Sequence, residues 1–277
     1  MSGKLYIVAT PIGNLEDITF RAINVLKSVD FIAAEDTRHT LKLLNHFGIQ
    51  KKLVSYYKEI EKNKSNFLIK ELLDGNNIAL VSDAGTPGIS DPGEEIIKKA
   101  IENDIEIIPI PGACAFVNAL IVSGLSTKEF CFIGFLSANK KEREDKLEEI
   151  RYLNKTILFY EAPHKLKSTL ESLLKVLGNR KIVLAKEITK IHESFVRGNI
   201  EDILNELNEP KGEFVIVVEG SEITEKELEK NNLNEMSLEE HYKYYEDKGL
   251  DKKDIIKAIA KDRNLPKNDI YQEFIKK

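Results

Sequence analysis

The residues best able to do chemistry in this sequence lie in short loops that follow apolar runs. The richest loop is Leu80–Gly93, LVSDAGTPGISDPG, where glycines and prolines stand among small polar residues and two carboxylates, Asp83 and Asp91. So little side chain lets backbone amides and carbonyls approach a ligand closely. Such a loop at the carboxyl end of a strand is where open α/β sheets bind small molecules. Part of it also reads as a helix start, with Asp91 as N-cap and Glu94 completing a capping box.

Five further loops place small or charged residues directly after an apolar run. They are residues 9–15 (ATPIGNL), 34–38 (AEDTR), 111–115 (PGACA), 160–165 (YEAPHK) and 185–190 (AKEITK). Each alone could be an ordinary turn or a solvated charge cluster, and Asp36 could simply cap the next helix. Because they recur at strand ends in both halves of the chain, together they predict one ligand cleft between two domains.

Short apolar runs alternate with amphipathic patterns throughout the first 220 residues. Strands are predicted at 5–9, 31–34, 53–56, 78–81 and 105–110, and helices at 17–26, 37–46, 62–73 and 93–102. Alternating strands and helices favour an α/β fold with a mostly parallel sheet covered on both faces.

Pro109, Pro111 and Gly112 interrupt this pattern and predict a boundary between an N-terminal domain, 1–112, and a C-terminal α/β domain, 113–221. The second domain should open with a short helix at 113–122. Its further strands are predicted at 130–135, 156–160, 182–185, 194–197 and 213–219, and its helices at 140–153, 163–177 and 200–207.

The remaining residues, 222–277, differ in charge. Residues 222–240 hold two lysines and seven glutamates, whereas residues 248–277 hold nine Lys or Arg and five Asp or Glu. We therefore predict an acidic linker followed by a basic tail. Helices at 237–248, 252–262 and 267–276 around an Asn-Leu-Pro turn resemble a nucleic-acid-binding helix-turn-helix. A plain helical hairpin fits the same spacing.

Composition limits the class of protein. The chain has 277 residues, a net charge of −5 and no apolar run that approaches the roughly 20 residues of a membrane span. No signal peptide is expected, and two cysteines without CxxC or histidine-rich spacing predict no metal site. We expect a cytoplasmic protein that does not bind membranes. The usual dinucleotide, Walker, zinc-protease and hydrolase signatures do not occur.

The loops together resemble those of the tetrapyrrole methylase superfamily. The strings are ATPIGNLEDIT, AEDTRHT, SDAGTPGISDPG, PIPGACAFVNAL, FIGFL, FYEAPHKL, LAKEITKIHE and GEFVIVVEG, in order from Leu5 to about Gly220. AEDTR and YEAPHK are the most specific, and they resemble the branch that methylates small-subunit ribosomal RNA. The tail resembles the C-terminal helix-turn-helix extension of that branch.

This resemblance implies a two-domain class III methyltransferase fold with a C-terminal helical extension and S-adenosyl-L-methionine in the cleft. It implies 2′-O-methylation of a cytidine ribose in 16S rRNA, at the decoding centre of the 30S subunit, by a homodimer. Carried over residue by residue, the cofactor should contact Ile12, Asp83, Gly85, Thr86, Cys114, Ala115 and Tyr160.

Methyl transfer to a ribose hydroxyl needs a base close to the hydroxyl. The candidates are Asp36, Lys186 and Glu187, with Glu161 as a further carboxylate. For phosphates that flank the target we expect contacts from Arg38, His164 and Lys165. Two other functions stay open: a corrin or porphyrin methyltransferase, and a non-catalytic RNA-binding protein that has kept the fold.

Overall fold

The computed structural model describes residues 2–275, which form two compact units. Among these described residues, the first unit comprises those up to Glu148 together with Thr156–Glu219, and the second comprises Glu149–Lys155 and those from Gly220 onward. The first unit holds two five-stranded sheets, whereas the second is helical.

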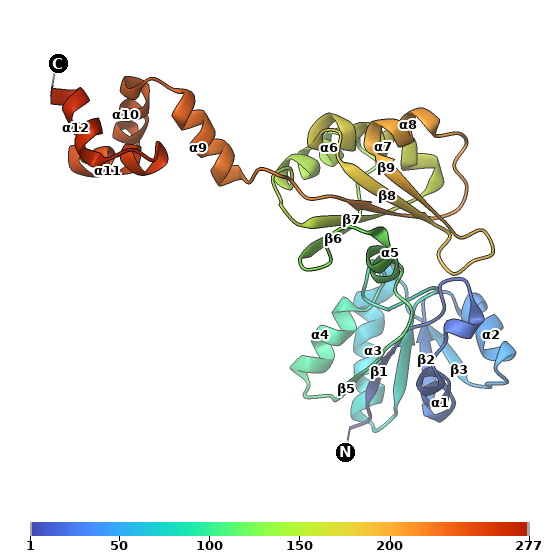
Figure 1. The fold of residues 1–277 in the computed structure, drawn as a ribbon. Helices are drawn as coiled ribbons and strands as arrows, with labels where there is room; N and C mark the ends of the chain where they lie inside the picture. Colours follow the sequence, from blue (N-terminus) through green and yellow to red (C-terminus); the bar gives the residue numbers. More distant parts are fainter. Residues whose placement is uncertain (1, 276–277) are drawn as a thin grey trace. The chain divides into compact units, whose positions relative to one another are not determined.

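The first sheet is parallel throughout and has the order β3-β2-β4-β1-β5 (Figure 1). Its strands are β1 (Leu5–Val8), β2 (Phe31–Ala34), β3 (Lys52–Ser55), β4 (Ile78–Val81) and β5 (Ile107–Ile110). The connections contain η1 (Leu15–Asp17), α1 (Phe20–Ser28), α2 (Thr37–His46), η2 (Lys58–Ile60), α3 (Glu61–Leu73) and α4 (Glu94–Glu102). In a parallel sheet all carboxyl ends meet at one edge, so the loops after β1, β2, β4 and β5 gather there.

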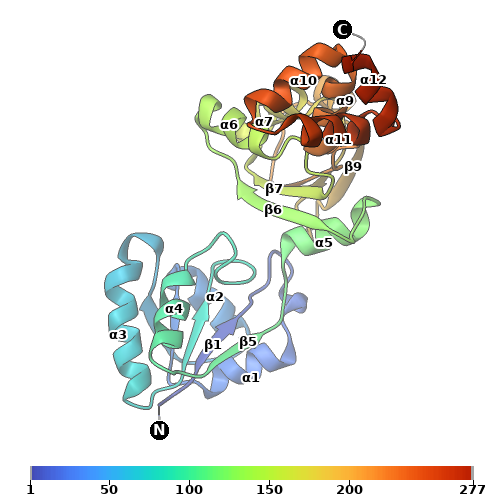
Figure 2. The same ribbon diagram turned by 90° about the vertical axis from the view of Figure 1, so that its left-hand side faces the viewer.

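Helices cover both faces of this sheet, as the alternating pattern predicts (Figure 2). Helices α3 and α4 pack on one face through Leu68, Leu72 and Ile96, and α1 and α2 pack on the other through Leu26 and Leu44. The predicted first helix, 17–26, is instead a 3-10 turn followed by α1, because the Thr19 hydroxyl accepts a hydrogen bond from Ala22 N and starts the helix there.

The second sheet has the order β6-β7-β10-β8-β9. Its elements are α5 (Ala115–Ser123), β6 (Phe130–Phe135), α6 (Lys140–Glu149), β7 (Thr156–Glu161), α7 (Pro163–Leu177), β8 (Lys181–Lys186), β9 (Ser194–Asn199), α8 (Ile200–Glu206) and β10 (Phe214–Val218). Helix α5 covers one face through Ala119 and Leu120, while α6, α7 and α8 lie over the other (Figure 1).

The expectation of mostly parallel strands is wrong for this second sheet. Only β6 and β7 pair in parallel, whereas β10 runs antiparallel to both β7 and β8, and β9 runs antiparallel to β8. The connection between β8 and β9 is too short for the crossover that a parallel pair requires, so it forms a hairpin.

The helical unit contains α9 (Glu225–Glu235), α10 (Leu238–Asp247), α11 (Lys252–Asp262) and α12 (Lys267–Ile275). Helix α9 lies in the segment predicted as an acidic linker, and a capping box between Thr224 and Glu227 starts it. The isoleucines of α11 and Ile270 of α12 form the apolar core with side chains of α10. The fully buried His241 joins the helices, because its ring contacts the Asp262 carboxylate and accepts a hydrogen bond from Arg263.

Candidate functional site

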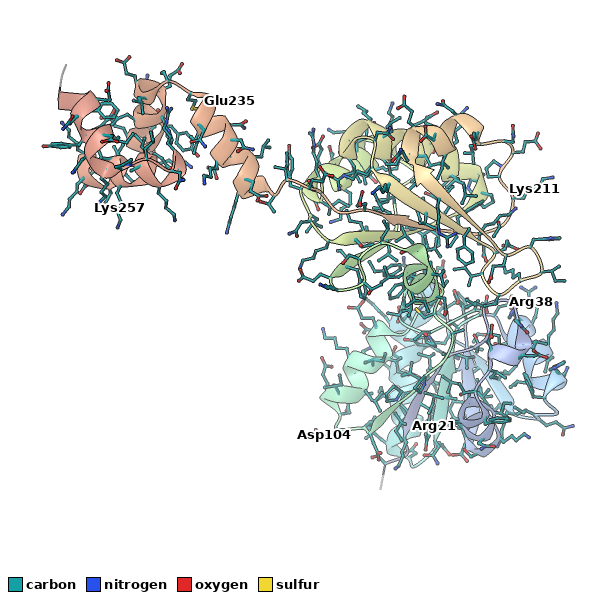
Figure 3. All side chains as sticks on the ribbon, in the orientation of Figure 1. Arg21, Arg38, Asp104, Lys211, Glu235 and Lys257 are labelled. Atoms are coloured by element: carbon teal, nitrogen blue, oxygen red, sulfur yellow. The ribbon has the colours of Figure 1, made fainter. Side chains whose placement is uncertain are left out.

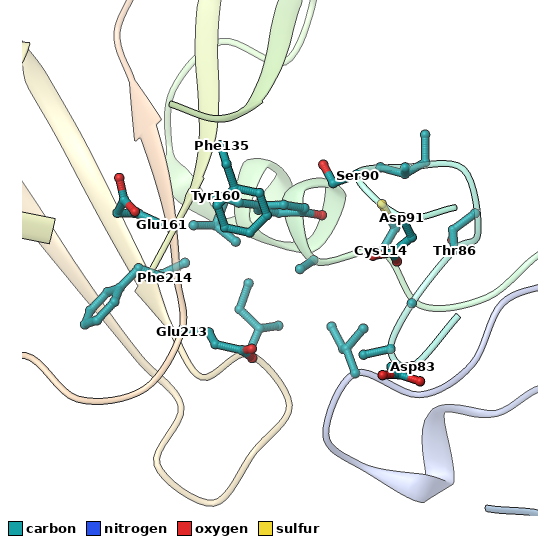
Figure 4. Close-up of a pocket in the computed structure, with 18 of the residues that line it drawn as sticks. Asp83, Thr86, Ser90, Asp91, Cys114, Phe135, Tyr160, Glu161, Glu213 and Phe214 are labelled. Atoms are coloured by element: carbon teal, nitrogen blue, oxygen red, sulfur yellow. The ribbon is translucent and has the colours of Figure 1, made fainter. Parts of the chain in front are cut away.

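A cavity of about 420 Å³ opens at the carboxyl edge of the first sheet and is lined by both sheets of the first unit (Figure 4). The first sheet supplies loop residues that are mostly small. The second sheet supplies larger side chains from the ends of β6, β7, β8 and β10. The lining residues are Ile12, Glu35, Asp83–Thr86, Ile89–Asp91, Cys114, Ala115, Phe135, Tyr160–Ala162, Ala185, Glu187, Ile188, Lys190 and Glu213–Val215.

Backbone and side-chain hydrogen bonds tie together the three small-residue loops, 9–15, 80–93 and 111–115. Thr10 and Gly85 exchange both backbone bonds, at 2.8 and 3.1 Å, and the Thr86 hydroxyl donates to the Ala113 carbonyl at 3.1 Å. Gly85 has φ of +85°, and a Cβ there would lie 3.2 Å from Cγ2 of Ile12. A side chain at this position would strain the backbone and crowd the neighbouring loop.

The expected helix cap in the glycine loop is wrong. Helix α4 begins at Glu94, and its N-cap is Gly93, with no capping bond from its own loop. Glu61, 32 residues earlier, supplies the cap instead: its Oε1 accepts from Gly93 N at 2.9 Å and from Glu95 N at 3.3 Å. Because Glu61 takes this role, Asp91 is free to line the cavity.

Three carboxylates of the first sheet's loops share one side of the cavity. The Asp83 carboxylate accepts from Asp36 N at 2.9 Å, and Asp83 N lies 3.4 Å from Glu35 Oε2. Burial raises the pKa of Glu35. Burial, followed by repulsion from Glu35, raises the pKa of Asp91 to about 6. The region is therefore a negative, partly desolvated surface that favours a bound cation.

An aromatic side chain faces these carboxylates. Tyr160, at the end of β7, points its hydroxyl toward Cys114 and Asp91 (Figure 4), and that oxygen accepts from Phe116 N at 3.4 Å. Burial raises the pKa of both Tyr160 and Cys114, so both groups stay neutral. The cavity therefore has a neutral, half-buried part between the two sheets, formed by these two side chains.

The second sheet contributes a bridge of alternating charge. Lys190 Nζ lies 2.9 Å from Glu187 Oε1 and 2.9 Å from Glu213 Oε2, and Glu213 N donates to Glu187 Oε1. These bonds, led by the one from Glu213 N, lower the pKa of Glu187. A Cβ on Gly13 would lie 2.3 Å from Cγ of Lys190, so the lysine side chain passes directly over the first loop. The β8–β9 loop thereby rests on the loop after β1.

The seven residues expected to contact a cofactor, Ile12, Asp83, Gly85, Thr86, Cys114, Ala115 and Tyr160, all line this one cavity. Of the expected catalytic residues, Glu187 lines it. Lys186 ends β8 and is not among the lining residues. Asp36 caps α2, and Arg38 holds its carboxylate through two side-chain contacts, at 3.1 and 2.8 Å, that lower its pKa.

The remaining charged candidates lie outside the cavity lining or already accept hydrogen bonds from other residues of the protein. Arg38, labelled in Figure 3, has a side chain that is 88% exposed. His164 and Lys165 lie in the first turn of α7, and His164 is exposed. Glu161 lines the cavity, but its carboxylate accepts from Thr169 Oγ1 at 2.6 Å and from Ala162 N at 2.8 Å.

Asp91, Lys190 and Phe135 line the cavity but were not among the candidates chosen from the sequence. Asp91 was assigned to a cap that Glu61 supplies from another helix, and no local pattern indicates that replacement. Lys190 belongs to the charged loop 185–190 that the sequence indicates. Its position over Gly13 is a tertiary contact, which no local sequence pattern predicts.

Within residues 2–275, no cluster of side chains with metal-ligand chemistry is found. Nor is any helix of these residues long and apolar enough to span a membrane.

Fold and site agree with one family. The model of the tetrapyrrole (corrin/porphyrin) methylases matches residues 4–204, and the chain therefore belongs to this family. The solved structure of a diphthine synthase has the same fold: its TM-score is 0.60 at 16% identity, with 82% of this chain and 94% of that chain covered.

Closer relatives carry a more particular name. The chain is 51% identical over 275 residues to a ribosomal RNA small subunit methyltransferase I of Halalkalibacterium halodurans, covering 98% of this chain and 94% of the relative. It is 47% identical over 274 residues to the protein of the same name from Bacillus subtilis, with the same shares of each chain covered.

Proposed function

We propose that this protein uses S-adenosyl-L-methionine to methylate 16S rRNA in the small ribosomal subunit, at the 2′-oxygen of a cytidine ribose in the decoding centre. The observation that carries the proposal is the acidic cavity in which all seven expected cofactor residues meet. The names of relatives with 51% and 47% identity support the RNA substrate.

The cavity suits this cofactor in size and in charge. Its volume of about 420 Å³ lies within the range of small-molecule sites. S-adenosyl-L-methionine carries a sulfonium and an ammonium cation, and Asp83 and Asp91 offer carboxylates to them. The loops at Gly85 and Ala115 would hold the rest largely through backbone groups, because they present little side chain.

The bound cofactor supplies an activated methyl group. The chain's residues must then align the ribose oxygen with that group, and such alignment can contribute up to about 7–11 kcal/mol. As the new C–O bond forms and the S–C bond breaks, the hydroxyl proton passes to a base. A general base contributes roughly 10²–10⁴-fold.

Among the proposed bases, Glu187 lies in the cavity, whereas Lys186 would have to reach it from the end of β8. The carboxylate of Asp36 is held by Arg38, which lowers the pKa of Asp36 and weakens it as a proton acceptor. Single-turnover methylation of 30S subunits by Lys186→Ala and Glu187→Ala tests the assignment. If both variants keep rates within about threefold of the parent, neither residue is the base.

Phosphates must bind outside the cavity, because six carboxylates and only one lysine line it. Arg38, His164 and Lys165 are the proposed phosphate contacts near it. The basic residues of α11 and α12, which include Lys257 (Figure 3), are the proposed contacts of the helical unit with more distant RNA.

The proposed homodimer has a candidate surface on α5. Three apolar side chains of this helix, Val117, Ile121 and Val122, are exposed, and Ile121 is 64% exposed. Clustered apolar side chains of this kind are typical of surfaces that a partner covers. Sedimentation of the full chain at several concentrations tests the dimer, and an Ile121→Lys variant should sediment as a monomer.

Calorimetric titration with S-adenosyl-L-methionine, together with methylation assays on 30S subunits and a tetrapyrrole, separates the three functions. The proposal predicts binding of one cofactor per chain and methyl transfer to 30S subunits. A non-catalytic RNA-binding protein would show no cofactor binding. A corrin or porphyrin methyltransferase would bind the cofactor but would leave 30S subunits unmethylated and transfer the methyl group to a tetrapyrrole.

A further inference from the structure

The aromatic side chain of Phe135 lines the cavity and is nevertheless exposed to solvent. Phe135 ends β6 and is 59% exposed. A single exposed apolar side chain is common on protein surfaces and carries no meaning by itself. The backbone that places Phe135 is what distinguishes it.

A β-bulge turns Phe135 onto the cavity face. Phe132 pairs with Leu158 and Phe135 pairs with Tyr160, so three residues of β6 span two residues of β7. In a regular strand, residues three apart point to opposite faces. The extra residue puts Phe135 on the same face as Phe132, and Gly134, with φ of +79°, takes up the distortion.

The bulge also joins Phe135 to the loop that carries Asp91. A Cβ on Gly134 would lie 3.3 Å from the Ser90 hydroxyl, so the first sheet's glycine loop reaches the bulge. On its other side, the Phe135 ring lies 5.5 Å from the Tyr160 ring, tilted by 58° (Figure 4). Tyr160 thus supports one side of the ring, and more than half of the Phe135 side chain stays exposed to solvent.

We propose that Phe135 is a substrate-positioning residue whose ring stacks on the base of the nucleotide to be methylated. This inference rests on the proposed function. A planar base stacks well on an exposed phenyl ring, whereas the acidic lining repels phosphates. The nucleotide therefore enters base and ribose first, with its phosphates left outside. The adenine of the cofactor is the other possible planar ligand, but the small-residue loops at Gly85 and Ala115 belong to the opposite, cofactor-binding side of the proposed site.

Phe135→Leu removes the stacking surface and keeps an apolar side chain. It should raise KM for 30S subunits by about 5- to 150-fold, the range that loss of one base–aromatic stack gives at a tenfold change per 1.4 kcal/mol. The calorimetric Kd for S-adenosyl-L-methionine and the melting temperature should stay at the parent's values. Phe135→Trp should restore KM. The matched control is Phe130→Leu, on the same strand but outside the cavity lining, which should leave KM unchanged.

The Phe135→Trp variant also reports directly on the cofactor, because the natural chain contains no tryptophan. Its emission should be unchanged when S-adenosyl-L-methionine alone is added. Quenching by the cofactor, or a parallel rise in the cofactor's Kd in Phe135→Leu, would place adenine on this ring and overturn the inference. An unchanged KM in Phe135→Leu, or an equal rise of KM in Phe130→Leu, would overturn it as well.

Failure of the proposed function gives a different result. The unsubstituted protein would then bind the cofactor and leave 30S subunits unmethylated, and the inference about Phe135 would be wrong with it.

Discussion

The two sheets of the first unit contribute to the cavity in different ways. The parallel sheet supplies loops of small residues and carboxylates, such as Gly85 and Asp91, held together by backbone bonds. The mixed sheet supplies large side chains, Phe135, Tyr160 and Lys190, placed by a bulge, a strand end and a hairpin. The first arrangement suits a small cationic cofactor. The second suits a larger substrate, with Tyr160, also an expected cofactor contact, between the two. Variants of the parallel sheet's loops should therefore change the affinity for the cofactor. Variants of the mixed sheet should change kcat or KM for 30S subunits.

The largest effect is expected from Gly85→Ala on the cofactor side. The residue would adopt φ near +85° and press a methyl group toward Ile12, so the loop should shift. Since a displacement of about 1 Å can cost on the order of 100-fold, kcat/KM for methylation should fall by about that factor, together with cofactor affinity. Gly48→Ala is the control, because φ is +63° there and nothing lies within 4 Å. An equal loss in the control would assign the effect to backbone strain alone.

Asp91→Asn should raise the Kd for S-adenosyl-L-methionine by roughly 10- to 100-fold, through the loss of a partly buried charge that faces a cation. In the parent protein, affinity should fall as the pH is lowered through about 6, because the carboxylate becomes protonated. The variant should show a flatter profile. Calorimetry between pH 5 and 8 checks this; identical profiles would mean that Asp91 does not face the cation.

Ionisation of Asp91 should also affect folding stability, but in the opposite direction: lowering the pH weakens cofactor binding and raises the contribution of Asp91 to the free energy of unfolding. The pKa of Asp91 is raised on folding from an ordinary 3.8 to about 6, so the folded protein binds this proton more tightly than the unfolded chain does. Its ionisation opposes folding at neutral pH. The contribution of Asp91 to the free energy of unfolding should grow as the pH falls from about 7 to about 4, and Asp91→Asn should remove that part of the pH dependence. Urea titrations of both proteins measure it.

On the substrate side, Lys190→Ala should lower kcat for methylation by roughly tenfold and leave the cofactor's Kd unchanged. Its removal leaves Glu187 and Glu213 facing each other without a cation and frees the hairpin from the first loop. Lys211→Ala, an exposed lysine two residues before Glu213, is the control. A change in cofactor affinity instead would show that the two sides are not separate.

A smaller effect on chemistry is expected from the helical unit. Deleting the residues after Glu222 should weaken binding to 30S subunits and flatten the salt dependence of that binding, because fewer phosphates are neutralised. Activity at saturating substrate should change little. The salt dependence of KM measures this, and unchanged KM at all salt concentrations would contradict an RNA-binding role for α11 and α12.

Local patterns in the sequence predict some elements of this structure, whereas features that depend on tertiary contacts cannot be predicted from it. Strands β2 and β4 and helix α2 were predicted with the bounds that the structure shows, because local apolar patterns and Asp36 as a cap determine them. Parallel edges bring successive loops together, so the loops that hold Asp83–Thr86 and Cys114–Ala115 could be expected to meet, whereas the seven individual cofactor residues, Tyr160 of the mixed sheet among them, rest on the family resemblance. The roles of Glu61 and Gly134 could not be, because a cap supplied from 32 residues away and a bulge set by pairing with β7 are tertiary contacts.

The most direct test of the account is mass mapping of 16S rRNA fragments from 30S subunits incubated with the protein and S-adenosyl-L-methionine. The account predicts one additional methyl group, on the ribose of a single cytidine in the decoding centre, that forms on the order of 100-fold more slowly when Gly85→Ala replaces the parent. A methyl group on a base, or unmodified RNA despite cofactor binding, would contradict it.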